Sequence, residues 1–214
     1  VYALFADQVS GDLKGLTVYW DSLATDLALD SGAALGLPLK ISVEVVLIFI
    51  FFGQLLVASG GGRFFIDLAM AMVGHKRGGA AKISVVASAF FGSISGSAIS
   101  NVASTGVITI PLMRHAGYSG INAGAIESVA STGGQFMPPI MGAAAFLMSE
   151  ILEIPYTDIV VAALVPAMLY YFAVFIMVDR VAAKDKVGQV DEDLPKMGSV
   201  LLQGGHFLLP FVVL

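Results

Sequence analysis

Two stretches of the chain are apolar over the length that a membrane crossing requires. Residues 38–59 read PLKISVEVVLIFIFFGQLLVAS and end at three consecutive glycines, and residues 159–178 form the second stretch. Because a helix needs about 20 apolar residues to cross the hydrocarbon core, each stretch predicts a membrane-spanning helix. Residues 203–214 are again apolar and predict the start of a truncated transmembrane helix.

Three further segments are too polar or too short to span a membrane. Residues 1–37 carry five aspartates against one lysine, which predicts an extramembrane segment on the periplasmic side or at the interface. Residues 63–74, RFFIDLAMAMVG, predict an interfacial helix, either on the membrane surface or packed beneath the bundle. Residues 179–202 predict a connecting arm on the cytoplasmic side.

Residues 83–112 are uncharged, but their middle is rich in serine and glycine, which disfavours helix and favours a turn. Each apolar arm has about half of the ~20 residues that a crossing needs. The segment therefore predicts a re-entrant helical hairpin that enters and leaves on the same side. The alternative is a helix whose small residues, such as Gly92 and Gly96 in G-x-x-x-G spacing, serve only close packing.

Residues 119–152 are too long for one straight crossing, since they would extend about 50 Å as a helix. Their middle holds Pro138 and Pro139, which lack the backbone donor that a helix needs. The segment predicts a broken helix with an unwound link, and a simple kink is the alternative. Glu127 lies one turn before the link, where it is either a proton or cation partner or a carboxylate bonded to backbone donors.

Composition places the chain in a membrane. Hydrophobic residues make up 57% of the sequence and charged residues 13%, with a mean hydropathy of +0.87, whereas soluble domains carry about 25% charge. The net charge of −5 argues against a nucleic-acid partner. The sequence has no cysteine, which excludes disulfides and thiolate chemistry. It also lacks the G-x-S-x-G elbow and the phosphate-loop lysine motif, so we expect no enzyme.

The distribution of lysine and arginine supports the hairpin independently. If residues 83–112 are re-entrant, nine of the eleven basic residues face one side, which the positive-inside rule makes cytoplasmic. If the segment spanned the membrane instead, the basic loop after residue 178 would lie outside. The nine residues are Arg63, Lys76, Arg77, Lys82, Arg114, Arg180, Lys184, Lys186 and Lys196.

Two interrupted segments in one membrane domain indicate a secondary transporter. Non-helical backbone at membrane depth is tolerated only inside protein or beside water. Its free carbonyls, together with Ser, Thr and Asn oxygens, suit a hard cation such as Na⁺, and half-helix N-termini favour an anionic substrate group. A structural membrane-bundle component and a channel without ion-coupled transport remain the alternatives.

Two long motifs resemble the large membrane subunit of TRAP (tripartite ATP-independent periplasmic) transporters. They are FGSISGSAISNVASTGV, from Phe91 to Val107, and ESVASTGGQFMPPIMGAAAF, from Glu127 to Phe146. The resemblance covers residues 38–214 and is nearest to the fused-permease branch that works with TAXI-type binding proteins. It implies an all-α integral membrane repeat of an elevator-type, Na⁺-driven importer of a carboxylate-bearing solute.

The resemblance also implies a multi-pass position in the bacterial inner membrane and a set of partners. These are a periplasmic substrate-binding protein, a small membrane subunit or its fused equivalent, and a second inverted repeat, since this chain matches the first repeat only. The surrounding lipid bilayer is the remaining partner.

Matching the motifs residue by residue gives the candidate site, which lies between the hairpin turn and the unwound link. The resemblance implies no cofactor other than Na⁺ as coupling ion, held by the carbonyls of Gly96 and Gly133 and the side-chain oxygens of Ser100 and Asn101. Pro138 and Pro139 would hold the link open. The full set of ion- and substrate-binding candidates is Ser93, Ser95, Gly96, Ser97, Ser100, Asn101, Ser131, Thr132, Gly133, Gly134 and Gln135.

Overall fold

The computed structural model describes residues 47–188, 190 and 194–209, together with a few positions between 19 and 44. Most of the segment 1–37, the first part of the segment 38–59 and residues 210–214 therefore lie outside the described residues. The chain divides into a unit of residues 1–48 and a unit of residues 49–214. The second unit is described below.

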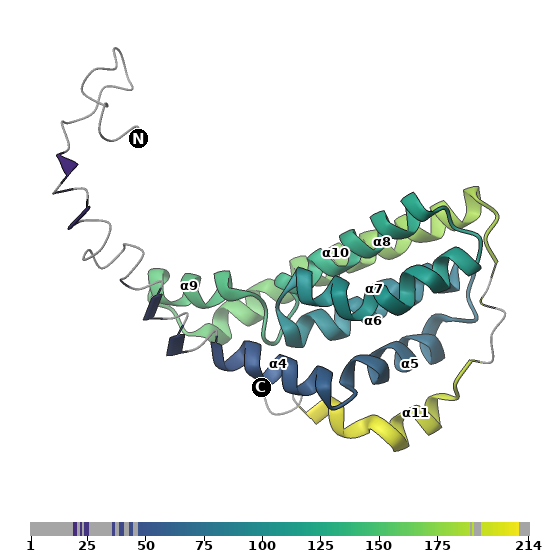
Figure 1. Cartoon of the computed structure of the whole chain (residues 1–214), viewed down its shortest axis with the longest axis horizontal. Helices are drawn as coiled ribbons and strands as arrows, with labels where there is room; N and C mark the ends of the chain where they lie inside the picture. Colours follow the sequence, from purple (N-terminus) through teal and green to yellow (C-terminus); the bar gives the residue numbers. More distant parts are fainter. Residues whose placement is uncertain are drawn as a thin grey trace, which may run out of the picture. The chain divides into compact units, whose positions relative to one another are not determined.

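Every regular element in the described part of that unit is a helix, which confirms the all-α class. Figure 1 shows α6, α7 and α8 side by side, and α5 and α10 pack against α6. The helices are α4 (Leu47–Ala58), α5 (Gly61–Val73), α6 (Gly79–Ser95), α7 (Ala98–His115), α8 (Gly120–Thr132), α9 (Ala143–Leu152), α10 (Tyr156–Lys184) and α11 (Met197–Gly204). Two short 3-10 turns are η4 (Gly133–Gln135) and η5 (Gly205–Leu208).

Among the described helices, α10 is long and apolar enough to cross a membrane, with 29 residues. It begins before residue 159 and continues to Lys184, so it includes the first residues of the expected polar arm. An ion pair accounts for the extension: Asp179 on α10 accepts from Lys82 Nζ of α6 at 2.5 Å and from Arg77. These contacts hold the last turns of α10 against the bundle.

The apolar segment that follows the N-terminal unit is bent. The helices Ile50–Ala58 and Gly61–Val73 together are long and apolar enough for a span, but they meet at 71°. The bend lies at Gly60, whose φ of +100° is readily adopted only by glycine. Beyond it, Phe65 and Ala69 of α5 are fully buried, and α5 packs between α6 and α11. This helix is therefore part of the bundle.

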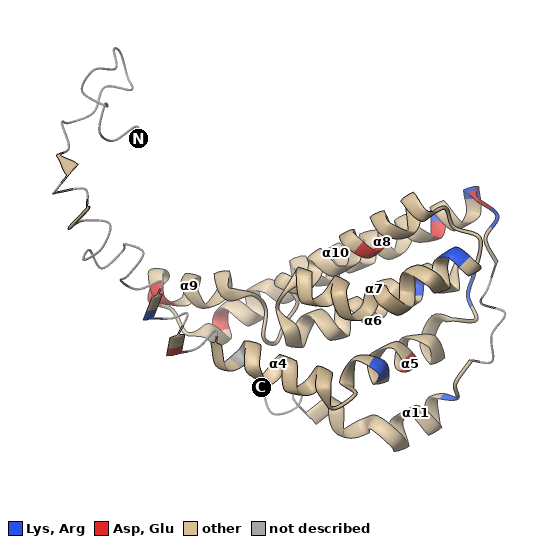
Figure 2. Ribbon diagram, viewed as in Figure 1, with Lys and Arg blue, Asp and Glu red and all other residues tan. Residues whose placement is uncertain are grey.

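Small side chains allow α6, α7 and α8 to lie close together, as is usual between membrane helices. Ala80, Ala81 and Ala87 of α6 and Ala123 and Ala130 of α8 are all fully buried. Figure 2 shows that charged residues gather toward the helix ends and are sparse along the middle of α6, α7 and α8. A charged group buried in this middle region therefore requires a specific explanation.

Candidate ion and substrate site

Helices α6 and α7 form a hairpin whose turn is Gly96 and Ser97. Gly96 has a left-handed φ of +59°, and its N–H closes α6 by donating to the Gly92 carbonyl at 2.8 Å. Ser97 caps α7, because its Oγ accepts from the backbone N–H of Ser100 at 3.3 Å. A side chain at Gly96 would be strained at this φ and would overlap the carbonyl oxygen of Met141. The turn thus requires glycine, and its position in a bilayer stays a prediction.

The second interrupted segment leaves the α-helical conformation after Thr132 and resumes it at Ala143. Before the break, the hydroxyls of Tyr170 and Tyr171 on α10 donate to the carbonyls of Val129 and Ala130, at 2.7 and 3.1 Å. The last carbonyls of a helix lack partners within the helix. Helix α10 thus supplies donors where α8 ends.

Helix α10 also holds the chain after the break. The Tyr156 hydroxyl donates to the carbonyl of Pro139 at 3.1 Å and to that of Ile140. Its ring stacks on Phe146 of α9 with the centroids 4.6 Å apart. Pro138 and Pro139 are joined by a cis peptide bond, and the carbonyl of Pro139 is one of the groups that Tyr156 holds.

The end of α6 lies directly against the break. A Cβ added to Gly92 would lie 2.5 Å from the Cα of Gly134, so the two main chains touch where neither residue has a side chain. The Ile140 N–H donates to the Ser93 carbonyl at 3.1 Å. The structure therefore brings the region of the hairpin turn and the link into contact.

The serines around the turn differ in whether their hydroxyls have hydrogen-bond partners. Ser93 Oγ donates to the Phe90 carbonyl of its own helix at 2.7 Å. Ser95 Oγ is buried and has no hydrogen-bond partner among the described residues. Ser100 lies partly buried on the first turn of α7. Because a buried hydroxyl without a partner costs about 1–3 kcal/mol, Ser95 has unused capacity to bind a polar ligand.

Asn101 is fully buried between the hairpin arms and α8. Its Nδ2 donates to the carbonyl of Ser88 at 2.9 Å and to that of Ser131 at 3.4 Å. Its Oδ1 accepts from Thr105 Oγ1 at 3.3 Å, which is a long contact. The amide thus bridges α6 and α8, and Oδ1 is the atom of this side chain that remains suited to a cation.

Not every candidate in the link faces the turn. Thr132 and Gln135 are exposed, and Thr132 Oγ1 donates to the Ser128 carbonyl at 2.8 Å. Ser131 Oγ donates to Glu127, not to a residue of the turn. Gly133 packs against Tyr170 and Tyr171, where a Cβ would come within 2.8 Å of the Tyr171 hydroxyl.

The most extensive polar cluster of the hairpin arms includes residues that the motif match did not select. Glu127 is fully buried, and its carboxylate accepts from hydroxyls of α6, α7 and α8. The sequence contains a signal for this cluster, because its polar residues recur at a spacing of i, i+4, which places each pair on one face of a helix. The pairs are Ser84 with Ser88, Thr105 with Thr109, and Glu127 with Ser131.

At the other end of the bundle, Lys82 is buried and pairs with Asp179, and its Nζ lies 5.1 Å from the centroid of the Phe175 ring. Tyr118, in the loop before α8, has a buried hydroxyl without a partner in the described residues. Burial raises the pKa of Tyr118 to about 12, and the nearby Asp185 and Asp179 add to this effect. This end is held by charge pairs.

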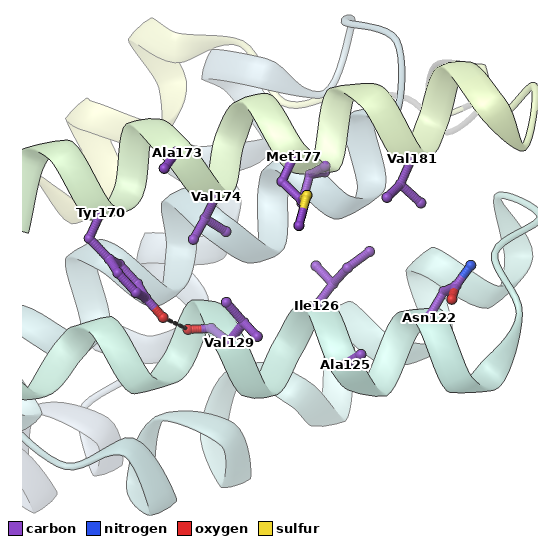
Figure 3. Close-up of a pocket in the computed structure, with 10 residues that line it drawn as sticks. Asn122, Ala125, Ile126, Val129, Tyr170, Ala173, Val174, Met177 and Val181 are labelled. Carbon is purple, nitrogen blue, oxygen red and sulfur yellow. Dashed lines mark hydrogen bonds between the residues drawn. The ribbon is translucent and has the colours of Figure 1, made fainter.

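An apolar groove of about 490 Å³ lies between α8 and α10, as Figure 3 shows. Its walls are mostly aliphatic, with Asn122 at one end and Tyr170 at the other. The Tyr170 hydroxyl is engaged by the Val129 carbonyl. The groove therefore offers few polar atoms to an ion or an anionic solute.

Comparisons with known proteins agree with the motifs. The chain matches the family model described as "Tripartite ATP-independent periplasmic transporter, DctM component" over residues 24–214. It is 29% identical over 128 residues to the 2,3-diketo-L-gulonate TRAP transporter large permease protein YiaN of Escherichia coli (strain K12), covering 60% of this chain and 30% of that protein.

Two further relatives carry the description C4-dicarboxylate TRAP transporter large permease protein DctM. The one from Pseudomonas aeruginosa is 31% identical over 139 residues, which are 65% of this chain and 32% of the relative. The one from Rhodobacter capsulatus is 35% identical over 74 residues, which are 35% of this chain and 17% of the relative. The chain thus spans about a third or less of the length of these relatives.

Proposed function

Because this chain belongs to the DctM family, the large permease component of tripartite ATP-independent periplasmic transporters, we propose that it forms the first inverted repeat of a Na⁺-coupled, elevator-type importer. The match to about a third of the relatives' length supports a single repeat. In this proposal α6 and α7 are the re-entrant hairpin, and α8 and α9 are the two halves of the broken helix.

The observation that carries the proposal is the contact between Gly92 and Gly134, which joins the hairpin to the helix break. Interrupted helices that meet in a membrane domain are typical of ion and substrate sites in secondary transporters. The proposed Na⁺ ligands are the carbonyls of Gly96 and Gly133, the Ser100 hydroxyl and Asn101 Oδ1. Neutral oxygens of this kind suit a hard monovalent cation.

The fit of the turn and the link to a cation rests on how far the oxygen atoms there are already used in hydrogen bonds. Asn101 Oδ1 accepts one long contact, and Ser95 Oγ beside the turn accepts and donates none among the described residues. Both atoms therefore have lone pairs to offer. Gly133 O accepts only a 3.3 Å bond from the Phe136 N–H among the described backbone contacts.

The solute and partners follow from the family and remain part of the proposal. Relatives are described as acting on 2,3-diketo-L-gulonate and C4-dicarboxylates, which are carboxylate anions. We propose a carboxylate solute, delivered in the periplasm by a TAXI-type binding protein to a multi-pass permease of the inner membrane. A small membrane subunit, separate or fused, and a second repeat would complete the transporter.

A cysteine reporter near the turn tests the Na⁺ site without knowledge of the solute. Ile94 is 1% exposed and unsuitable, whereas Ile99, on the first turn of α7, is 84% exposed. The variant Ile99→Cys would be made in the full-length permease freed of other cysteines, and its alkylation by N-ethylmaleimide measured as Na⁺ replaces K⁺. We expect a saturable change in rate with Na⁺.

Two additional variants show whether the response comes from the proposed ligands. Ser100→Ala should raise the half-saturating Na⁺ concentration about tenfold, equivalent to about 1.4 kcal/mol of lost ligation. Ser128→Ala, an exposed serine of α8, should leave it unchanged. A rate indifferent to Na⁺, or one that Ser100→Ala does not alter, would contradict the site and favour a purely structural hairpin.

A further inference from the structure

A carboxylate lies at the centre of the hairpin arms, away from the turn. Glu127 of α8 has an exposed fraction of zero. Its Oε2 accepts from Ser84 Oγ of α6 at 2.7 Å and from Thr109 Oγ1 of α7 at 2.5 Å. Its Oε1 accepts from Thr105 Oγ1 at 2.6 Å and from Ser131 Oγ at 3.1 Å. Three helices thus meet on one side chain.

None of the hydrogen bonds to this carboxylate in the described structure comes from a cation. The charged and titratable groups on the helices packed against α8 have other places or partners. Lys82 of α6 and Asp179 of α10 pair with each other, the Tyr170 and Tyr171 hydroxyls donate to backbone carbonyls, and Arg114 and His115 lie at the far end of α7. Arg180 and Lys184 lie in the last turns of α10.

Among the described residues, the hydrogen-bond donors to an ionised carboxylate in this position are all hydroxyl groups. Burying a charge is costly unless it is paired, and four hydroxyl donors offset only part of that cost. Binding a proton would remove the charge. Protonation is favourable only if every buried hydroxyl around Glu127 keeps a hydrogen-bond partner.

Thr105 and Thr109 can keep their hydrogen bonds in both states, because each hydroxyl has a second acceptor on its own helix. Thr105 Oγ1 lies 2.8 Å from the Asn101 carbonyl, and Thr109 Oγ1 lies 3.0 Å from the Thr105 carbonyl. Each hydroxyl has one proton, so it donates either to Glu127 or to the residue four positions earlier, whose carbonyl accepts it and, for Thr105, whose amide oxygen also lies within 3.3 Å. When Glu127 is ionised the threonines can donate to it, and when it is protonated they can return to their helix.

The threonine oxygens can accept the new proton, because Thr105 Oγ1 lies 2.6 Å from Glu127 Oε1 and Thr109 Oγ1 lies 2.5 Å from Oε2. Ser88 Oγ lies 3.4 Å from both Thr105 Oγ1 and Ser131 Oγ, in the same cluster as the Glu127 carboxylate. Hydroxyl oxygens freed from donating to the carboxylate can accept from its acid proton. Both protonation states therefore have a complete set of hydrogen-bond partners in the same packing.

We propose that Glu127 is a reversible proton-binding site, with Thr105 and Thr109 as the donors that switch between the carboxylate and their own helix. This proposal does not depend on the Na⁺ site proposed at the turn, although Thr105 also contacts Asn101, whose Oδ1 is a proposed Na⁺ ligand. The bound species is a proton taken from water. No covalent bond other than O–H forms or breaks.

Infrared difference spectroscopy of the full-length permease in lipid nanodiscs tests this directly. The sample would be exchanged between about pH 5 and about pH 9 in K⁺ buffer, a range that brackets a carboxyl group stabilised in either form. We expect a reversible carbonyl-stretch band of a buried carboxylic acid. Glu127→Gln should remove the band, whereas Glu150→Gln, at an exposed position of α9, should retain it.

A second pair of variants keeps the test valid if Glu127→Gln does not fold. Thr109→Val removes a donor to the ionised form and should increase proton affinity about tenfold, seen as a larger acid band at the same pH. Thr157→Val is the matched control, because Thr157 is an exposed threonine on the first turn of α10.

Three results would overturn the proposal. One is a wild-type spectrum without an acid band at any pH, which would mean a permanently ionised structural carboxylate. Another is an acid band that is present in the absolute spectrum but does not change over the pH range. The third is a carboxylate band that is unchanged by pH in K⁺ buffer but shifts when Na⁺ replaces K⁺ at constant pH, which would make Glu127 a cation ligand. The Na⁺ response of Ile99→Cys is a separate measurement, so either proposal can fail alone.

Discussion

The hairpin of α6 and α7 makes two different contacts, one with the η4 turn that follows α8 and one with α8 itself. Near the turn, Gly92 meets Gly134 through main-chain atoms, and Ser95 Oγ remains without a partner in the described structure. Along the arms, Glu127 is surrounded by hydroxyls that donate to it. The glycine contact depends on the absence of side chains, whereas the contact at Glu127 depends on hydrogen bonds between polar side chains.

This difference indicates which part of the molecule can change its conformation. Separating two glycines breaks few specific bonds, whereas separating the arms from Glu127 would leave a buried carboxylate and several hydroxyls unsatisfied, at about 1–3 kcal/mol for each group. We therefore expect ligand-dependent movement at the turn and the break, with the arms and α8 moving together.

The largest effect should come from filling the glycine contact. Gly92→Ala places a Cβ 2.5 Å from the Gly134 Cα, and backbone cannot yield as a flexible side chain does. We expect a loss of about 3 kcal/mol in the free energy of unfolding, from overpacking. Thermal unfolding of the purified permease in detergent measures it. Gly124→Ala on α8, with open space around its Cβ, should be neutral or slightly stabilising.

Removing one donor from the arms should have the next largest effect. Ser84→Ala deletes the hydroxyl that donates to Glu127 Oε2 at 2.7 Å. Because the acceptor is a carboxylate, we expect a loss of about 2 kcal/mol, measured in the same unfolding experiment. The loss should be smaller at low pH if Glu127 binds a proton there. A loss no greater than that of Ser128→Ala would show that the arms are not held by this cluster.

The smallest change in the free energy of unfolding should come from removing a tyrosine hydroxyl. Tyr171→Phe removes the donor to the Ala130 carbonyl at the end of α8, and we expect a loss of about 1 kcal/mol. Tyr118→Phe removes a buried hydroxyl that has no partner among the described residues and should cost nothing or stabilise. Equal losses in the two variants would mean that ring packing, and not the hydrogen bond, supports the break.

Local sequence carries much of the architecture. The all-α class follows from hydropathy, and the positions where helices stop follow from Gly96, Gly133 and the Pro138–Pro139 pair, because backbone preferences are properties of a residue and its neighbours. The limits of α10 were harder to predict. Its polar last turns stay helical through the ion pair of Asp179 with Lys82, which is 97 residues away in sequence.

The candidate site also has parts that the sequence predicts and parts that depend on packing. The motifs selected the turn and the link, and the structure brings these two regions into contact. The motifs also selected Thr132 and Gln135, which are exposed, and they left open the role of Glu127. Spacing of i, i+4 marks which hydroxyls share a helix face, but it does not tell which faces meet.

The membrane character, the family and the places where the helices are interrupted can be predicted from the residues alone, since they depend on composition, hydropathy and local backbone preference. The contact of Gly92 with Gly134, the bridge that Asn101 makes between two helices and the four hydroxyls around Glu127 cannot be predicted in this way. Those features depend on how α6, α7 and α8 rotate and pack against one another. The burial of Glu127 arises from that packing, because it removes water from the carboxylate and puts hydroxyl groups in its place.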